Sequence, residues 1–256
     1  MVAIELPAPE VLWGPAPIDW CEPNRPSVNP FGVEELHNTW SNLMYVIVGI
    51  LMFREYVYSM PAHKRDPIYF SFCINTIMTG ITSGWFHATL IFIAQKSDEF
   101  FENAAVVSLM YFHVMPRNPS RPASGRYFIF SAHLTALALG VILIPELFCE
   151  VHLITVVLVC FGKALGSIKS TVDDETLKVK IISIFNKSFV AAGLSFALWI
   201  IDFVFCSPLV AKFYLHAFFW HFGTAFALFW GGKGSLELGI AMQAKDKATE
   251  GSYKSS

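Results

Sequence analysis

Long apolar stretches, separated by short polar connections, run along most of this chain. A membrane-spanning helix needs about 20 apolar residues to cross a hydrocarbon core about 30 Å thick. The pattern predicts an all-α membrane protein in which residues 40–230 form a seven-helix bundle, with spans at about 40–58, 68–93, 100–115, 127–145, 147–161, 181–206 and 213–230. Residues 1–39 form a separate amino-terminal segment. The tail, 231–256, alternates small and charged residues and is predicted to be disordered.

Positive charges are distributed unevenly between the two sides of this predicted bundle. Of the 18 Lys and Arg residues, all but Arg25, Lys96 and Lys212 fall on the side that holds the carboxyl terminus. Because Lys and Arg accumulate in cytoplasmic loops, we expect a lumenal or outside amino terminus and a cytosolic carboxyl terminus. The chain is 54% hydrophobic with a net charge of -2, so we expect no nucleic-acid partner.

Three histidines, His87, His216 and His221, interrupt stretches that are otherwise suited only to lipid. In the predicted topology His87 lies near the outer end of the second helix, and the other two lie in the outer half of the seventh. Ionisable groups within membrane helices are costly and usually functional. Neutral imidazoles suit zinc, and three protein ligands leave a fourth position for water. We therefore predict a zinc site made of these three side chains.

Two more polar residues are predicted at the same depth. Ser83 precedes His87 by four residues and so shares its helix face, and Asp98 opens the third predicted helix on the same side. The ordinary alternatives are a serine bonded to its own backbone and an acid that favours the start of a helix. Asp202, in the sixth predicted helix, is a further functional candidate whose role the sequence leaves open.

The ordered motifs of this chain resemble those of alkaline ceramidases. The motifs are Asp19-Trp20-Cys21-Glu22-Pro23-Asn24, Glu35-Leu36-His37-Asn38-Thr39-Trp40-Ser41-Asn42, Ser83 with Phe86-His87-Ala88-Thr89-Leu90, Asp98-Glu99, and Tyr214-Leu215-His216 with Trp220-His221. They extend from about residue 13 to 225 in consistent order. The resemblance implies a multi-pass, seven-span amidase of endoplasmic reticulum or Golgi membranes, which uses zinc to cut ceramide into a sphingoid base and a fatty acid. It also implies that Asp98 is the general acid–base and that Ser83 donates a hydrogen bond to the oxyanion.

The spacing of the last two histidines departs from the family pattern, which is usually His-x-x-x-His. Four residues separate His216 from His221 here. On a regular α-helix this spacing would place the two imidazoles roughly 140° apart. A π-bulge absorbs one extra residue, and such bulges are frequent at functional sites. We predict a π-bulge between His216 and His221.

The amino-terminal segment carries a second candidate metal site. Asp19, Glu22, Asn24 and Glu35 are hard oxygen ligands in a proline-stiffened loop, which suits Ca²⁺. The resemblance adds the backbone carbonyl of Trp20 and selects Glu35 over its neighbour Glu34. The ordinary alternative is a solvated acidic stretch that caps the first helix.

The five cysteines are too few for a disulfide scaffold. The predicted topology places Cys21, Cys149 and Cys206 outside, where an oxidising lumen permits a disulfide. We predict a bond between Cys21 and Cys206, which would clip the calcium loop to the bundle. Cys149 is the competing partner.

Taken with the resemblance, these features favour an intramembrane, zinc-dependent hydrolase of ceramide, dihydroceramide or phytoceramide in the bilayer, with zinc and calcium as cofactors. No obligate protein partner is evident. One alternative is a seven-span receptor of the adiponectin or progestin type, which would share the fold and the metal. Another is a transporter or channel, although that class would spread its polar residues through the full membrane depth.

Overall fold

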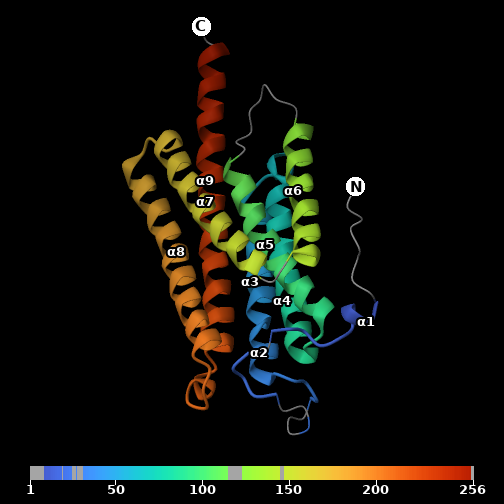
Figure 1. Cartoon of the computed structure of the whole chain (residues 1–256). Coiled ribbons are helices and arrows are strands. Elements are labelled where there is room, and N and C mark those ends of the chain that lie inside the picture. The colour runs from blue at the N-terminus through green and yellow to red at the C-terminus, as the bar shows by residue number, and fades with distance from the viewer. Residues whose placement is uncertain are drawn as a thin grey trace.

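The computed structural model describes residues 9–254, apart from 19, 25–26, 28–30, 115–122 and 145–146. All regular elements in these residues are helices, which confirms the predicted all-α class (Figure 1). In chain order they are α1 (Pro9–Leu12), α2 (Leu36–Ser41), α3 (Leu43–Ser59), η1 (Ala62–Lys64), α4 (Pro67–Thr89), α5 (Phe92–Val114), α6 (Ala123–Leu143), α7 (Leu147–Thr171), α8 (Glu175–Val204), η2 (Val210–Phe213), η3 (His216–His221) and α9 (Phe222–Lys254).

The long helices α3 to α9 follow the order of the predicted spans. By length and composition, the described residues hold three helical stretches able to cross a membrane, Ser124–Leu143, Phe148–Thr171 and Glu175–Val204. These belong to α6, α7 and α8. The other long helices carry more polar residues, and many of those are buried between helices, among them Asn75, Thr76, Ser108 and Ser235. A span that faces other helices can therefore be less apolar than one that faces lipid.

The bundle is organised around α4 and α9. Helix α4 packs against α3 and α5, and α9 packs against α8 and α3. The main apolar cluster includes Tyr45, Met52, Tyr69, Phe72 and Leu236. In Figure 1, α2, the start of α5 and the connection between α8 and α9 gather at one end of the bundle, and the carboxyl terminus lies beyond the other end. The predicted site residues therefore come from elements that meet at one end.

Local signals in the sequence set the limits of α4, which positions His87. Asp66 caps its start by accepting a hydrogen bond from the backbone N–H of Ile68 at 2.9 Å, and Pro67 occupies the first helical position. The helix ends at Leu90, which adopts a left-handed conformation with φ 48°. At Gly80, an added Cβ would lie 2.7 Å from the backbone oxygen of Asn42. Glycine therefore permits the close approach that brings α4 against the start of α3.

Two expectations drawn from the sequence pattern need correction. Helix α5 begins at Phe92, not near residue 100, so Asp98 lies in its second turn and does not open the helix. The polar residues before it satisfy one another: Lys96 pairs with Glu99 at 2.8 Å, and Gln95 donates to Glu99 at 2.5 Å. A helix can therefore run through this polar stretch.

The prediction of a disordered tail from residue 231 was wrong, because α9 continues to Lys254. Leu236 and Leu238 are buried within it. At Gly232 an added Cβ would lie 2.7 Å from the Phe72 ring, so glycine lets α9 pack closely against α4. At least over residues 232–239, the weakly apolar sequence therefore belongs to a helix that packs closely against its neighbours and not to a solvated tail.

A disulfide joins Cys21 to Cys206, with 5.3 Å between the Cα atoms, which confirms the predicted pairing. Cys149, the competing partner, is a buried free thiol that donates to Glu99 at 3.3 Å. The bond links residues 185 apart in sequence and ties the amino-terminal segment to the end of α8.

We expect the double variant Cys21→Ser/Cys206→Ser to unfold at a lower temperature than the wild type. Removing a cross-link that closes so long a loop costs about 2–4 kcal/mol of folding free energy. Thermal unfolding of the purified protein measures the change. As the control, a reductant should lower the wild-type Tm and leave that of the double variant unchanged. Equal Tm values for the two oxidised proteins would contradict the prediction.

Candidate metal centre

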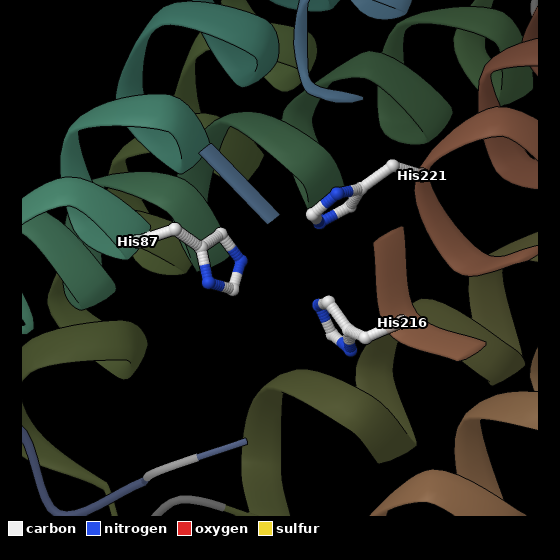
Figure 2. A group of neighbouring side chains, drawn as sticks. All are labelled: His87, His216 and His221. Atoms are coloured by element: carbon white, nitrogen blue, oxygen red, sulfur yellow. The ribbon is translucent and has the colours of Figure 1, made fainter. Parts of the chain in front are cut away.

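His87, His216 and His221 converge at one end of the bundle, as Figure 2 shows. His87 lies at the end of α4, and the other two are the first and last residues of η3. Each offers a ring nitrogen, and these atoms all lie within 4.8 Å of one another. The ring centroids are 4.6 to 5.1 Å apart, and no ring is more than 3% exposed. The structure thus brings together the three predicted zinc ligands.

The backbone from His216 to His221 forms a π-helical turn, which confirms the predicted π-bulge. The i→i+5 hydrogen-bond pattern of a π-turn brings residues five apart onto the same face. Just before the turn, Tyr214 adopts a left-handed conformation with φ 47°, which separates η2 from the new helix. The extra residue is therefore absorbed locally, and both imidazoles face His87.

The second ring nitrogens of two histidines are fixed by other side chains. His87 Nδ1 bonds Glu35 Oε2 at 2.5 Å, so it carries the proton that the carboxylate accepts. His221 Nδ1 lies 2.6 Å from Ser41 Oγ. Because the Ser41 hydroxyl donates to the backbone oxygen of Asn38 at 3.0 Å, it must accept from His221. Both rings are therefore held with Nε2 unprotonated, the state that binds a metal.

The donor set fits a zinc ion. Among the described residues, His216 Nδ1 and His221 Nε2 are buried nitrogens with no hydrogen-bond partner. Buried polar atoms are rarely left unpaired, and an exception calls for an explanation such as an ion. Three neutral imidazoles are a common set of zinc ligands. The Glu35 carboxylate bonds the second nitrogen of His87, and the Ser41 hydroxyl bonds that of His221, as is usual for histidines that hold a metal.

The backbone of the amino-terminal segment positions Glu35. The N–H groups of Glu34 and Glu35 donate to the backbone oxygens of Ala88 and His87, at 3.2 and 3.0 Å. These bonds dock the segment on the end of α4. Glu35 is fully buried, and its second oxygen, Oε1, has no hydrogen-bond partner among the described residues.

The other predicted calcium ligands differ in their surroundings. Glu22 accepts hydrogen bonds from the backbone N–H groups of His37 and Asn38, at 2.8 and 2.7 Å, so it caps the start of α2. The Trp20 ring stacks on His216, with 4.0 Å between centroids. Asn24 is exposed, and Asp19 lies outside the described residues. Capping, the ordinary alternative drawn from the sequence, therefore describes part of what Glu22 does.

Ser83 and Asp98 meet beside the histidines. Ser83 lies on α4 and is 3% exposed. Its hydroxyl lies beside the Asp98 carboxyl of α5. Asp98 and His216 line one small cavity of about 60 Å³. The two predicted catalytic residues are thus paired next to the candidate metal ligands.

A larger cavity of about 270 Å³ lies farther into the bundle, between α3, α5, α7, α8 and α9. Its walls are mainly aromatic and aliphatic, with Val106, Leu153, Phe161, Phe189, Phe196 and Trp220 among them. Glu102 lines both cavities. Neither Glu102 nor Ser41 was predicted from the sequence as a site residue. For Glu102 the signal was an acid within an apolar stretch, whereas the role of Ser41 depends on a contact 180 residues away.

Asp202 connects the disulfide region to the candidate metal centre. Its carboxylate accepts a hydrogen bond from the Cys21 backbone N–H at 3.4 Å. The carboxylate also lies near the backbone N–H of His216. Asp202 therefore lies between the disulfide and the start of η3.

The fold and the site define a class: all-helical membrane proteins with a buried three-histidine centre near one end of the bundle. A family model described as Ceramidase matches residues 14–253, so this chain belongs to the ceramidase family. The match confirms the resemblance drawn from the motifs and does not favour the receptor alternative.

Curated relatives agree with this membership. The chain is similar to alkaline ceramidase 1 of Mus musculus, with 35% identity over 83 residues, which are 32% of this chain and 29% of that protein. It is also similar to an alkaline ceramidase of Drosophila melanogaster, with 34% identity over 89 residues, which are 34% of this chain and 29% of that protein. In both cases the matched region spans less than a third of the relative's length.

Proposed function

We propose that this protein hydrolyses the amide bond of ceramide and releases a sphingoid base and a fatty acid. The observation that carries the proposal is the convergence of three buried histidines with the Ser83–Asp98 pair beside an apolar cavity. Two names among the similar proteins, alkaline ceramidase 1 and alkaline ceramidase, support this substrate. The apolar walls suit a hydrocarbon chain, and the polar groups at one end suit an amide.

The zinc ion would be held by His87, His216 and His221. When bound, zinc supplies Lewis-acid activation of water and of the substrate carbonyl. Asp98 then accepts a proton from the attacking water and delivers it to the leaving nitrogen. Ser83 donates a hydrogen bond to the oxygen that becomes negative, a contribution of about 3 kcal/mol in comparable sites. The proximity of Ser83 to Asp98, and the position of Asp98 in one cavity with His216, support these roles.

We also propose a Ca²⁺ ion in the amino-terminal segment, bound by Glu35, Glu22, Asn24 and the Trp20 carbonyl, together with Asp19. The buried Glu35 Oε1, with no partner among the described residues, supports a cation there. Such an ion stabilises a loop by gathering oxygen ligands. Its effect on the reaction would be indirect, through the position of Glu35 behind His87.

The proposed setting is a seven-span bundle in the endoplasmic reticulum or Golgi membrane. Helices α3 to α9 would cross the bilayer, with the histidines near the lumenal face and the carboxyl terminus in the cytosol. The distribution of Lys and Arg supports this orientation. The Cys21–Cys206 disulfide supports it as well, because it lies at the end of the bundle that would face an oxidising lumen.

We expect purified protein to release fatty acid from ceramide, to lose this activity with a zinc chelator and to regain it with added Zn²⁺. The variant Asp98→Asn should lower kcat by about 10²- to 10⁴-fold, the usual contribution of a general acid–base. Asp173→Asn, at an exposed ion pair with Lys245, is the matched control and should keep full activity. Quantified fatty-acid release measures each effect. If the purified protein cleaved no ceramide, the proposed function would be contradicted.

A further inference from the structure

An open groove runs along one face of α8, beside α9. The two helices lie side by side in Figure 1. None of the residues that line the groove lines either of the cavities described above. It has a polar part toward the start of α8 and an apolar part beyond it, formed respectively by Ser183, Asn186 and Lys187 and by Val190, Leu194 and Phe226.

Lys187 is exposed in this groove and forms no ion pair within the part of the chain that the structure describes. Two turns closer to the start of α8, Lys180 pairs with Glu237 of α9 at 2.9 Å. The Lys187 ammonium instead lies over the Trp230 ring of α9, with 4.4 Å from Nζ to the ring centroid. The face of an aromatic ring attracts a cation but does not neutralise its charge. The positive charge of Lys187 therefore remains uncompensated in the groove.

A second hydrogen-bond donor lies next to Lys187 and also lacks an acceptor. The indole N–H of Trp230 is buried, and none of the described residues accepts a hydrogen bond from it. Buried polar atoms are rarely left unpaired, and each exception calls for an explanation. An ammonium group and an indole N–H can only donate. Two neighbouring donors, one of them charged, indicate that an anion belongs at this position.

The depth of Lys187 in the bundle narrows the choice of anion. Lys187 follows Lys180 by seven residues, a rise of about 10 Å along the helix. In the proposed orientation α8 begins at the cytosolic side, so Lys187 lies below the cytosolic surface, and its long stem can extend toward the headgroups. Cations within apolar spans are costly and are usually paired. A phospholipid offers a phosphate near this level and acyl chains that continue deeper, toward Val190 and Leu194.

We propose that this groove binds an anionic phospholipid of the cytosolic leaflet. Its phosphate accepts hydrogen bonds from Lys187 and from the exposed Asn186 amide, and one acyl chain lies along Val190, Leu194 and Phe226. Basic grooves between membrane helices on the cytosolic side are typical sites for anionic headgroups. The site is separate from ceramide hydrolysis and rests only on the proposed orientation of the bundle.

The test places the full-length protein in nanodiscs and measures how phospholipids with brominated chains quench its tryptophan fluorescence. The part of the quenching that Trp230→Phe removes reports on the groove, because Trp230 lies beneath Lys187. We expect brominated phosphatidylserine to quench this part at a lower mole fraction than brominated phosphatidylcholine. Lys187→Gln should weaken phosphatidylserine binding about fivefold, which corresponds to about 1 kcal/mol for one basic side chain. Lys187→Arg should retain it.

Lys180→Gln is the matched control, because it changes the net charge by the same amount on the same helix and outside the groove. It should keep the wild-type affinity. An equal loss in Lys180→Gln and Lys187→Gln would overturn the inference, since a general attraction between charges would then explain it. Equal quenching by the two phospholipids in the wild type would also overturn it.

Added oleate distinguishes a phospholipid from a free fatty acid, which carries a carboxylate on a similar chain. We expect oleate to displace phosphatidylserine only at a higher mole fraction. Displacement at a lower mole fraction would overturn the assignment to a phospholipid. None of these measurements contains ceramide, so their failure would leave the proposed hydrolysis unaffected, and failure to cleave ceramide would leave this site unaffected.

Discussion

Replacing His221 with alanine is expected to remove bound zinc and lower ceramide hydrolysis by about 10³-fold or more. The variant would leave two imidazoles at a buried site and would remove the ring that donates a hydrogen bond to Ser41. Metal activation of water and carbonyl contributes several kcal/mol to a reaction, and each 1.36 kcal/mol corresponds to a factor of ten in rate. His221 is preferred to His216 for this test because its hydrogen bond to Ser41 establishes which nitrogen is free.

Two measurements check this prediction: zinc per protein chain by elemental analysis, and fatty-acid release. His63→Ala is the matched control, because His63 is exposed in η1, which precedes α4, whereas His87 lies in the last turn of that helix. It should keep both zinc and activity. A His221→Ala protein with full zinc content and full activity would remove the three-histidine site from the proposed mechanism.

Glu35→Gln is expected to weaken zinc binding by about 10- to 100-fold, although Glu35 is not predicted to touch the ion. Its Oε2 atom accepts the Nδ1 proton of His87 at 2.5 Å, and a carboxylate in this position orients the ring and raises its basicity. The amide keeps the size of the side chain and removes the charge. Because Oε1 is the proposed calcium donor, the same change should also abolish any dependence of activity on Ca²⁺.

Competition titration with a zinc indicator measures the affinity, and activity as a function of Ca²⁺ concentration measures the second effect. Glu34→Gln is a closely matched control: the residue is adjacent, and its backbone N–H docks on α4 in the same way. It should retain wild-type zinc affinity. Unchanged zinc affinity in Glu35→Gln would mean that the hydrogen bond from Glu35 to His87 does not contribute to zinc binding.

Several features of the fold and the site followed from local sequence. The order of the long helices came from the length of the apolar stretches, and the π-turn came from counting the residues between His216 and His221. Helix ends were harder to predict: α9 continues past Gly232 because glycine permits close packing on Phe72. A hydropathy profile cannot separate a glycine-rich buried helix from a solvated tail, since both are weakly apolar.

Chemistry that depends on contacts between distant segments required the tertiary structure. From the sequence, Glu35 was predicted only as a calcium ligand. The structure shows that it also bonds Nδ1 of His87, 52 residues away, and so orients that ring. Asp202 was suspected from its polarity, but its hydrogen bond to the Cys21 backbone and its position near His216 depend on how α8 ends.

Residue identity by itself determined the helical class, the histidine trio, the disulfide pairing and the family, because the length of apolar stretches, the type of ligand and the order of motifs are properties of the linear sequence. Packing decided which nitrogens of His87 and His221 are free, how Ser83 meets Asp98, and which acid faces the cavity. These depend on the direction of side chains from helices far apart in sequence, and only the assembled bundle sets that direction.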